Sequence, residues 1–171
     1  VSGNPFWIGG ALDYPQYLID NSLATPDWVL IHLGINDAFS YTTDATVIAA
    51  AIAAFVNLDL LITSIKAAGA GVKVGLMIPT PPANQDGFGA AYGTGQTAWR
   101  DKRNIMLWAQ ELITKYTGQE ASRIYLVPTN TALDVVNGYP LAASAAVNSR
   151  SSVMVQRQNN GVHPDTGGYQ Q

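Results

Sequence analysis

Residues 28–33 form an almost unbroken apolar run that ends abruptly at Gly34, Asn36 and Asp37. Alternating apolar and polar residues would indicate a strand with one solvated face. A continuous run of Val, Leu and Ile is instead typical of a strand covered on both faces, as in a parallel sheet. We therefore interpret His32, which lies within the run, as a core histidine. Because ligands bind at the carboxyl edge of such sheets, the polar residues after the run mark a candidate site.

Three segments with a helical spacing of apolar residues follow one another along the chain, at 12–21, 44–68 and 97–116. Thr42-Thr43-Asp44 offers an N-cap for the second helix, and Ala68-Gly69 offers a stop. Apolar residues at steps of three and four on this helix predict the stripe that covers a sheet: Ile48, Ile52, Phe55, Leu58, Ile62 and Ile65. The buried side of the third helix is predicted to carry Ile105, Leu107, Trp108, Leu112 and Ile113.

Two further strands are predicted at 72–78 and 123–127, each ended by a proline. The long segment 83–96 reads as a loop, and 141–158, which has no clear period, as a loop with a short strand. Strands that alternate with helices predict right-handed crossovers and a parallel sheet between helical layers. The first strand looks central rather than peripheral, because an apolar edge is open to unwanted pairing. We therefore expect one or two strands before Val1.

The composition narrows the class of protein. The chain has 171 residues, no Cys, 47% hydrophobic residues and a formal net charge of −3. This length suits one domain, 1–171, which we expect to be incomplete at the N-terminus and open to extension at the C-terminus. The negative charge argues against a nucleic-acid partner, and Asn57 and Asp59 interrupt the apolar segment 47–65 in a way that argues against a membrane span. The sequence shows no recognisable leader peptide and does not determine the compartment; an extracellular location is one option.

Two short blocks resemble those of a known enzyme family. Gly34-Ile35-Asn36-Asp37 matches the Gly-x-Asn-Asp block of the SGNH (GDSL-like) hydrolases. The segment from Asn160 to His163-Pro164 resembles the last block of that family, usually written Asp-x-x-His-Pro. Each block is weak alone, but the two occur in the family's order and on the expected elements.

The resemblance implies a three-layer α/β/α sandwich with a flavodoxin-like sheet, and ester hydrolysis by a serine nucleophile. His163 would be the general base. The Asn36 side-chain amide and the Gly3 backbone N–H would donate to the oxyanion, with Gly9 and Gly10 competing for the second role. The implied substrate is a small acyl ester, such as acetyl on carbohydrate or another alcohol, and no cofactor or metal is expected.

The chain departs from the family in two respects. The Gly-Asp-Ser block that carries the nucleophile is absent, so this chain alone lacks it, and we expect the serine upstream of Val1. The family's carboxylate, three residues before the histidine, is Asn160 here. In the serine-protease triad the same exchange costs about 10⁴ in turnover. Asn160 could still orient His163 through its carbonyl oxygen, and Asp165 or Asp134 could supply the charge.

These departures leave other interpretations open. The alternative function is a catalytically inactive carbohydrate-binding or structural module of the same fold.

Asp37 is expected to cap the following loop rather than to catalyse, and a metal site of Asp37, His163 and Asp165 has weak support. Two further sets could line the site: Trp99, Arg100 and Arg103 on the third helix, and Phe88 and Tyr92 on the long loop. For the first set a solvated face with an aromatic anchor is the favoured interpretation. A free edge on the first strand predicts a homo-oligomer or association with a missing N-terminal segment.

Overall fold

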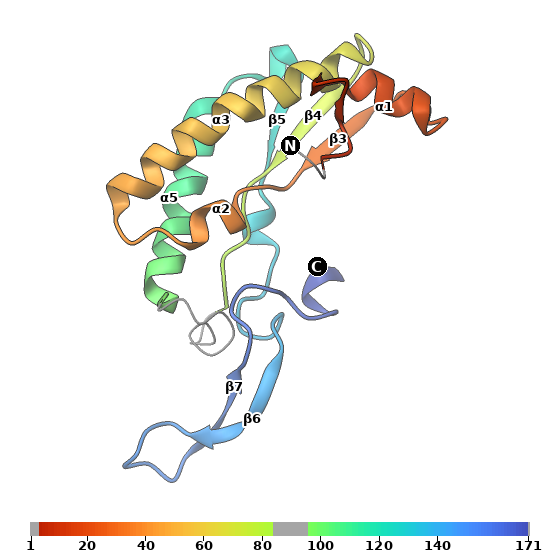
Figure 1. Ribbon diagram of the computed structural model, residues 1–171. Helices are drawn as coiled ribbons and strands as arrows, with labels where there is room; N and C mark the ends of the chain where they lie inside the picture. The colour runs from red at the N-terminus through yellow and green to blue at the C-terminus, as the bar shows by residue number, and fades with distance from the viewer. Residues whose placement is uncertain (1–3, 84–95, 171) are drawn as a thin grey trace.

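The chain folds around a three-stranded parallel sheet. The computed structural model describes residues 4–83 and 96–170 (Figure 1). Strands β3 (Trp28–Ile31), β4 (Lys73–Met77) and β5 (Ile124–Val127) are in the order β3-β4-β5, and both pairings are parallel. The three predicted strands are thus confirmed. Among the described residues, however, β3 pairs only with β4 and lies at the edge of the sheet, although its sequence predicts a central position.

Two long helices make the crossovers between these strands. Helix α3 (Asp44–Ala67) joins β3 to β4, and α5 (Ala98–Tyr116) precedes β5. The predicted cap of α3 is confirmed, because the Thr43 side chain accepts a hydrogen bond from the Thr46 N–H. The two helices pack against each other beside the sheet (Figure 1), and the Phe55 ring of α3 meets the Trp108 indole of α5 edge to face.

The predicted buried stripes are partly wrong. Ile52 on α3 is 56% exposed and Ile113 on α5 is 39% exposed. The buried residues of α3 are instead Val47, Ala51, Phe55, Ile62 and Ile65. Helix α3 is apolar on every side, so spacing alone does not determine which stripe faces the sheet.

The two faces of the sheet differ in cover. Alternate side chains of the strands, among them Ile31, Val74 and Leu76, are buried in the core with α3 and α5. On the opposite face Trp28 is 45% exposed and Leu30 58% exposed. The fold is therefore mixed α/β with a parallel sheet. No helical layer over the second face is present among residues 4–83 and 96–170.

A small N-terminal unit precedes the sheet. Strands β1 (Trp7–Ile8) and β2 (Ala11–Leu12) form a hairpin whose two-residue turn is Gly9-Gly10, with φ of 60° and 90°. The predicted first helix is α1 (Tyr14–Asp20), which begins two residues later than expected. It packs on α3, where the Tyr14 N–H donates to the Ser64 hydroxyl at 2.9 Å.

The C-terminal part contains a hairpin that the sequence pattern does not reveal. Strands β6 (Leu141–Ala146) and β7 (Met154–Gln158) pair antiparallel and extend away from the sheet (Figure 1). Its base is held by Gln158, which is 2% exposed and donates to the carbonyls of Val135 and Val136 at 2.7 and 2.8 Å. Short 3₁₀ turns complete the structure: η1 (Glu120–Ser122), η2 (Thr129–Thr131) and η3 (Gly168–Gln170).

Helix α3 is long and apolar enough to cross a membrane by length and composition alone. Core helices of water-soluble proteins pass the same test, so this is weak evidence. Asp59 on this helix accepts hydrogen bonds from Lys115 at 2.6 Å and from the Tyr116 hydroxyl at 2.8 Å. These contacts tie the middle of α3 to α5.

Candidate functional site

The candidate site begins where β3 ends. Gly34 has φ of 110° and is the N-cap of the short helix α2 (Ile35–Phe39), which carries Asn36 and Asp37. A Cβ on Gly34 would lie 2.3 Å from Nε1 of Trp108. Only glycine fits this position, because it combines a left-handed backbone with close packing against the indole. The sharp turn brings Asn36 to the carboxyl edge of the sheet.

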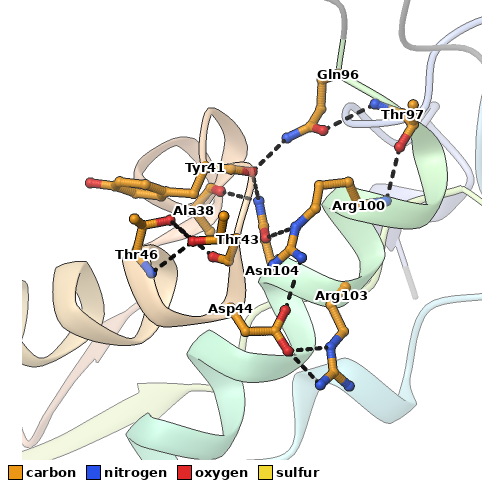
Figure 2. A network of polar contacts seen from close by, with 10 residues as sticks. All are labelled: Ala38, Tyr41, Thr43, Asp44, Thr46, Gln96, Thr97, Arg100, Arg103 and Asn104. Atoms are coloured by element: carbon orange, nitrogen blue, oxygen red, sulfur yellow. Dashed lines mark hydrogen bonds and ion pairs between the residues drawn. The ribbon is translucent and has the colours of Figure 1, made fainter.

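A polar network fixes α2 and the loop after it to α5 (Figure 2). The fully buried Asn104 donates through Nδ2 to the carbonyls of Ala38 at 2.9 Å and Tyr41 at 2.8 Å. Its Oδ1 accepts from Nε of Arg100 at 2.7 Å. The Gln96 side chain also donates to the Tyr41 carbonyl, at 3.3 Å. These bonds hold the helix that carries Asn36 in one orientation.

Arg100 and Arg103 complete this network through ion pairs with Asp44, and the Arg103 side chain is still 40% exposed. Arg100 Nη1 lies 2.8 Å from Oδ1 of Asp44, and Arg103 Nη2 lies 2.7 Å from Oδ2 (Figure 2). Hydrogen bonds from the two guanidinium groups lower the pKa of Asp44. Neither arginine is among the residues that line the candidate site, so the prediction that they line it is wrong. The solvated-face interpretation fits Arg103 but did not include the ion pairs with Asp44. Trp99 is 69% exposed and also lies outside the site lining.

The C-terminal loop that carries His163 is held by Asn160. The Oδ1 atom of Asn160 accepts hydrogen bonds from the N–H groups of Val162 and His163, both at 3.0 Å. The Ala83 N–H also donates to the Gly161 carbonyl at 3.0 Å, which ties the loop to the segment after β4. The Asn160 carbonyl oxygen therefore positions the backbone of residue 163, whereas the sequence suggested that it orients the imidazole.

Asn36 and His163 line one cleft at the carboxyl end of β3. Its volume is about 480 Å³, within the range usual for ligand sites. Both side chains are exposed, and the side chain of Asn36 makes no hydrogen bond to any described residue. The cleft wall also includes the following residues from the ends of β4 and β5 and from the C-terminal loop: Met77, Thr80, Thr129, Ala132, Leu133, Val162, Pro164, Gly168 and Tyr169.

His32 also lines this cleft, and its interpretation as a core histidine is wrong. The strand ends at Ile31, and the side chain of His32 is exposed at the edge of the sheet. Partial burial against the cleft wall lowers the pKa of this imidazole. The apolar run gave no indication that His32 is a site residue, because the sequence does not indicate that one face of β3 is open. Two imidazoles therefore border the cavity that Asn36 enters.

The candidate carboxylates serve as turn caps. Asp134 accepts from the N–H groups of Val136 and Asn137, and these bonds, with one from the Asn137 side chain, lower its pKa. Asp165 Oδ1 accepts from the Gly168 N–H at 2.8 Å. Asp37 lies in the first turn of α2 and on the cleft wall, where no hydrogen bond to the following loop is formed.

The remaining predicted site residues do not line the cleft or lie outside the described residues. Gly3, Phe88 and Tyr92 lie outside the described residues. Gly9 and Gly10 form the turn of the first hairpin. Among residues 4–83 and 96–170, no group of three or more His, Asp or Glu side chains is placed to hold a metal ion.

Comparisons with known proteins do not identify a family. No family model matches the chain, and neither curated proteins nor solved structures show significant similarity to it. The geometry of the cleft and the two sequence blocks therefore carry the functional proposal.

Proposed function

We propose that this chain forms the greater part of an ester-hydrolase site of the SGNH type. The observation that carries the proposal is that Asn36 and His163, from opposite ends of the sequence, line the same cleft. Asn36 follows the first strand of the sheet and His163 lies near the end of the chain. Each belongs to the block that resembles the family.

The proposed chemistry assigns one task to each side chain. His163 takes the proton from the attacking serine hydroxyl and returns it to the leaving alcohol. The Asn36 amide donates to the carbonyl oxygen as negative charge develops there, and such a donor contributes roughly 3–4 kcal/mol to transition-state stability. Its freedom from other hydrogen bonds among the described residues supports this role. Gly3 remains the proposed backbone donor.

The nucleophile is proposed to come from polypeptide upstream of Val1. The described residues of the cleft wall include no serine, and their hydroxyl groups belong to Thr80, Thr129 and Tyr169. Thr129 already donates to the Ile78 carbonyl at 2.6 Å. The fold would then be a complete three-layer sandwich once the open face and the free edge are covered. The substrate class proposed is a small acyl ester, with acetylated carbohydrate as the first candidate.

The same observation favours a second candidate function. A cleft whose described wall has amide and imidazole groups but no serine suits binding without turnover, as in a carbohydrate-binding module. Hydrogen-bonding groups on a partly apolar wall are typical of such sites. The two candidates differ in whether an acyl ester is consumed.

The test is hydrolysis of p-nitrophenyl acetate by the protein expressed from its complete reading frame. We expect His163→Ala to lower kcat by about 10² to 10⁴. Asn36→Ala should lower it by about 10² to 10³. A matched control is Asn148→Ala in the β6–β7 turn, which should leave the rate unchanged. Equal rates for wild type and His163→Ala would remove the hydrolase assignment and favour the binding module.

A further inference from the structure

The chain contains two Asn-Gly dipeptides, Asn137-Gly138 and Asn160-Gly161. In such a dipeptide the backbone nitrogen of the glycine can attack the side-chain carbonyl carbon of the asparagine. Glycine permits this approach because it has no side chain to obstruct it and the widest choice of backbone conformations. The attack closes a succinimide ring and releases the side-chain nitrogen as ammonia. The two sites share this local chemistry but differ in their hydrogen bonds.

The fold leaves the reacting groups of Asn160-Gly161 available. Oδ1 of Asn160 accepts from the N–H groups of Val162 and His163, both at 3.0 Å, and the side chain therefore folds back along the peptide bond that follows it. Two donors on this oxygen polarise the side-chain carbonyl and stabilise the negative charge that attack creates on it. Neither Nδ2 of Asn160 nor the backbone N–H of Gly161 donates to any described residue.

The fold engages the same groups at Asn137-Gly138. Nδ2 of Asn137 donates to Oδ2 of Asp134 at 2.8 Å, so the nitrogen that would leave is held in place. The Gly138 N–H donates to the Asp134 carbonyl at 2.8 Å, and this bond must break before the nitrogen can attack. Asn137 is the more exposed of the two asparagines, so exposure alone would predict the opposite order. Hydrogen bonding therefore favours reaction at Asn160.

Conversion of residue 160 to aspartate would add a negative charge next to His163. The side chain of Asn160 already bonds to the backbone of residue 163, and an aspartate has the same shape with a second acceptor oxygen in place of the amide nitrogen. A carboxylate at this position keeps both backbone bonds and strengthens them, because charged acceptors form stronger hydrogen bonds. It also favours the protonated form of a nearby imidazole.

We propose that Asn160-Gly161 is a site of spontaneous deamidation, which converts residue 160 to aspartate and places a carboxylate beside His163. The Gly161 nitrogen bonds to Cγ of Asn160, the Cγ–Nδ2 bond breaks, and the proton of Gly161 leaves with Nδ2 as ammonia. Water then cleaves the new bond between Cγ and the Gly161 nitrogen, so one water is consumed and no oxidant or reductant is needed. The bond from the Ala83 N–H to the Gly161 carbonyl favours this product over isoaspartate, whose longer backbone would displace that carbonyl.

The conversion does not depend on the proposed hydrolase function, whereas its effect on catalysis rests on that function. The new carboxylate would be a positioning residue that acts through His163, since it stabilises the imidazolium that forms when the serine loses its proton. An NMR titration of the His163 imidazole detects the added charge without any ester. Failure of hydrolysis and failure of this inference are therefore distinguishable.

The first experiment follows both asparagines in the 171-residue chain by peptide mapping and mass spectrometry during incubation at neutral pH. In the folded protein Asn160 should convert to aspartate about tenfold faster than Asn137 or more, because the bond at Gly138 must first break. In urea the fold no longer distinguishes the dipeptides, and the two rates should become similar. No conversion at Asn160, equal rates in the folded protein, or isoaspartate as the main product would overturn the proposal.

The second experiment compares wild type that retains the amide, converted wild type and Asn160→Asp. The midpoint of the His163 imidazole titration should be higher in the last two than in the first. In the protein from the complete reading frame, Asn160→Asp should raise kcat for p-nitrophenyl acetate about tenfold or more. The acidic limb of its rate–pH profile should move to higher pH, because the imidazole keeps its proton longer.

Asn148→Asp is the matched control, because it adds the same charge in the β6–β7 turn. Its Oδ1 accepts from the Arg150 N–H at 2.9 Å, a bond that a carboxylate also makes. This variant should change neither the titration nor the rate. An unchanged midpoint in Asn160→Asp, or an equal rise in Asn148→Asp, would overturn the proposal. A raised midpoint with unchanged hydrolysis would support the added charge and count against the proposed hydrolase function.

Discussion

Gly34 lies against the indole of Trp108 so closely that a Cβ on residue 34 would come within 2.3 Å of Nε1. This contact joins the end of β3, the start of α2 and the middle of α5 at one point. The turn that directs Asn36 into the cleft therefore depends on the lack of a side chain at Gly34 and on the large indole of Trp108.

We predict that Gly34→Ala destabilises the protein by roughly 3 kcal/mol or more, from the left-handed backbone and the clash with Trp108 together. Urea unfolding measures the loss. Gly71→Ala is the matched control, since a Cβ at Gly71 meets nothing within 4 Å and should change stability by less than about 1 kcal/mol. Equal effects of the two substitutions would contradict the close approach.

Asn104→Leu should destabilise the protein by roughly 2–4 kcal/mol. The substitution keeps the size of the side chain but removes the Asn104 bonds to the carbonyls of Ala38 and Tyr41, and only the Tyr41 carbonyl keeps a second side-chain donor, Gln96. Thermal or urea unfolding gives the stability. NMR should show enhanced amide exchange in α2. A change in packing confined to residue 104 would not produce this effect. A fully stable variant with unchanged exchange in α2 would show that the network does not hold this helix.

Asp101 should make stability fall as the pH rises from about 4 to about 7. Burial raises the pKa of this carboxyl from 3.8 to about 7, and no described residue donates to its Oδ1. Between these values the unfolded chain loses the proton while the folded protein keeps it, so ionisation favours unfolding. The full effect, of the order of 4 kcal/mol at most, is reached above pH 7.

The measurement for Asp101 is urea unfolding as a function of pH, compared with Asp101→Asn. The variant should lose the decline between pH 4 and 7 and should gain stability relative to wild type as the pH rises. Parallel pH profiles for the two proteins would show that the proton is not retained on folding.

The 171-residue chain alone should not react with a fluorophosphonate probe, because the nucleophile is proposed to lie upstream of Val1 and the described residues of the cleft wall include no serine. Labelling is measured by intact mass. Wild type and His163→Ala should both remain unmodified under conditions that label a control serine hydrolase. Stoichiometric labelling that is lost in His163→Ala would place an activated nucleophile within this chain and contradict the proposed external serine.

The fold was largely predictable where the apolar pattern and the stop signals agreed. Strands β4 and β5 are apolar runs followed by Pro79 and Pro128, and α3 begins after Thr43. Ile52 was wrongly assigned to the core because α3 is apolar on every side. The β6–β7 hairpin was missed because runs of Ala and Ser between 141 and 146 give no alternation.

The site was predictable in part, because its two blocks have a recognisable spacing. The blocks predict Asn36 and His163 as site residues, and both line the cleft. His32 was not named as a site residue, since the pattern around it predicts a strand covered on both faces. Which faces are covered is a tertiary property, and a single sequence does not contain the contacts that decide it. The same is true of Asn104, whose role depends on carbonyls more than 60 positions away.

The central claim is that Asn36 and His163 face one cavity, and paramagnetic broadening tests it most directly. The chain has no cysteine, so Asn36→Cys provides a single site for a nitroxide. The label should broaden the imidazole resonances of His163 strongly, whereas the same label at Glu120→Cys, before β5 at the opposite edge of the sheet, should leave them sharp. Sharp His163 resonances with the nitroxide at position 36 would contradict the shared cleft and the function proposed from it.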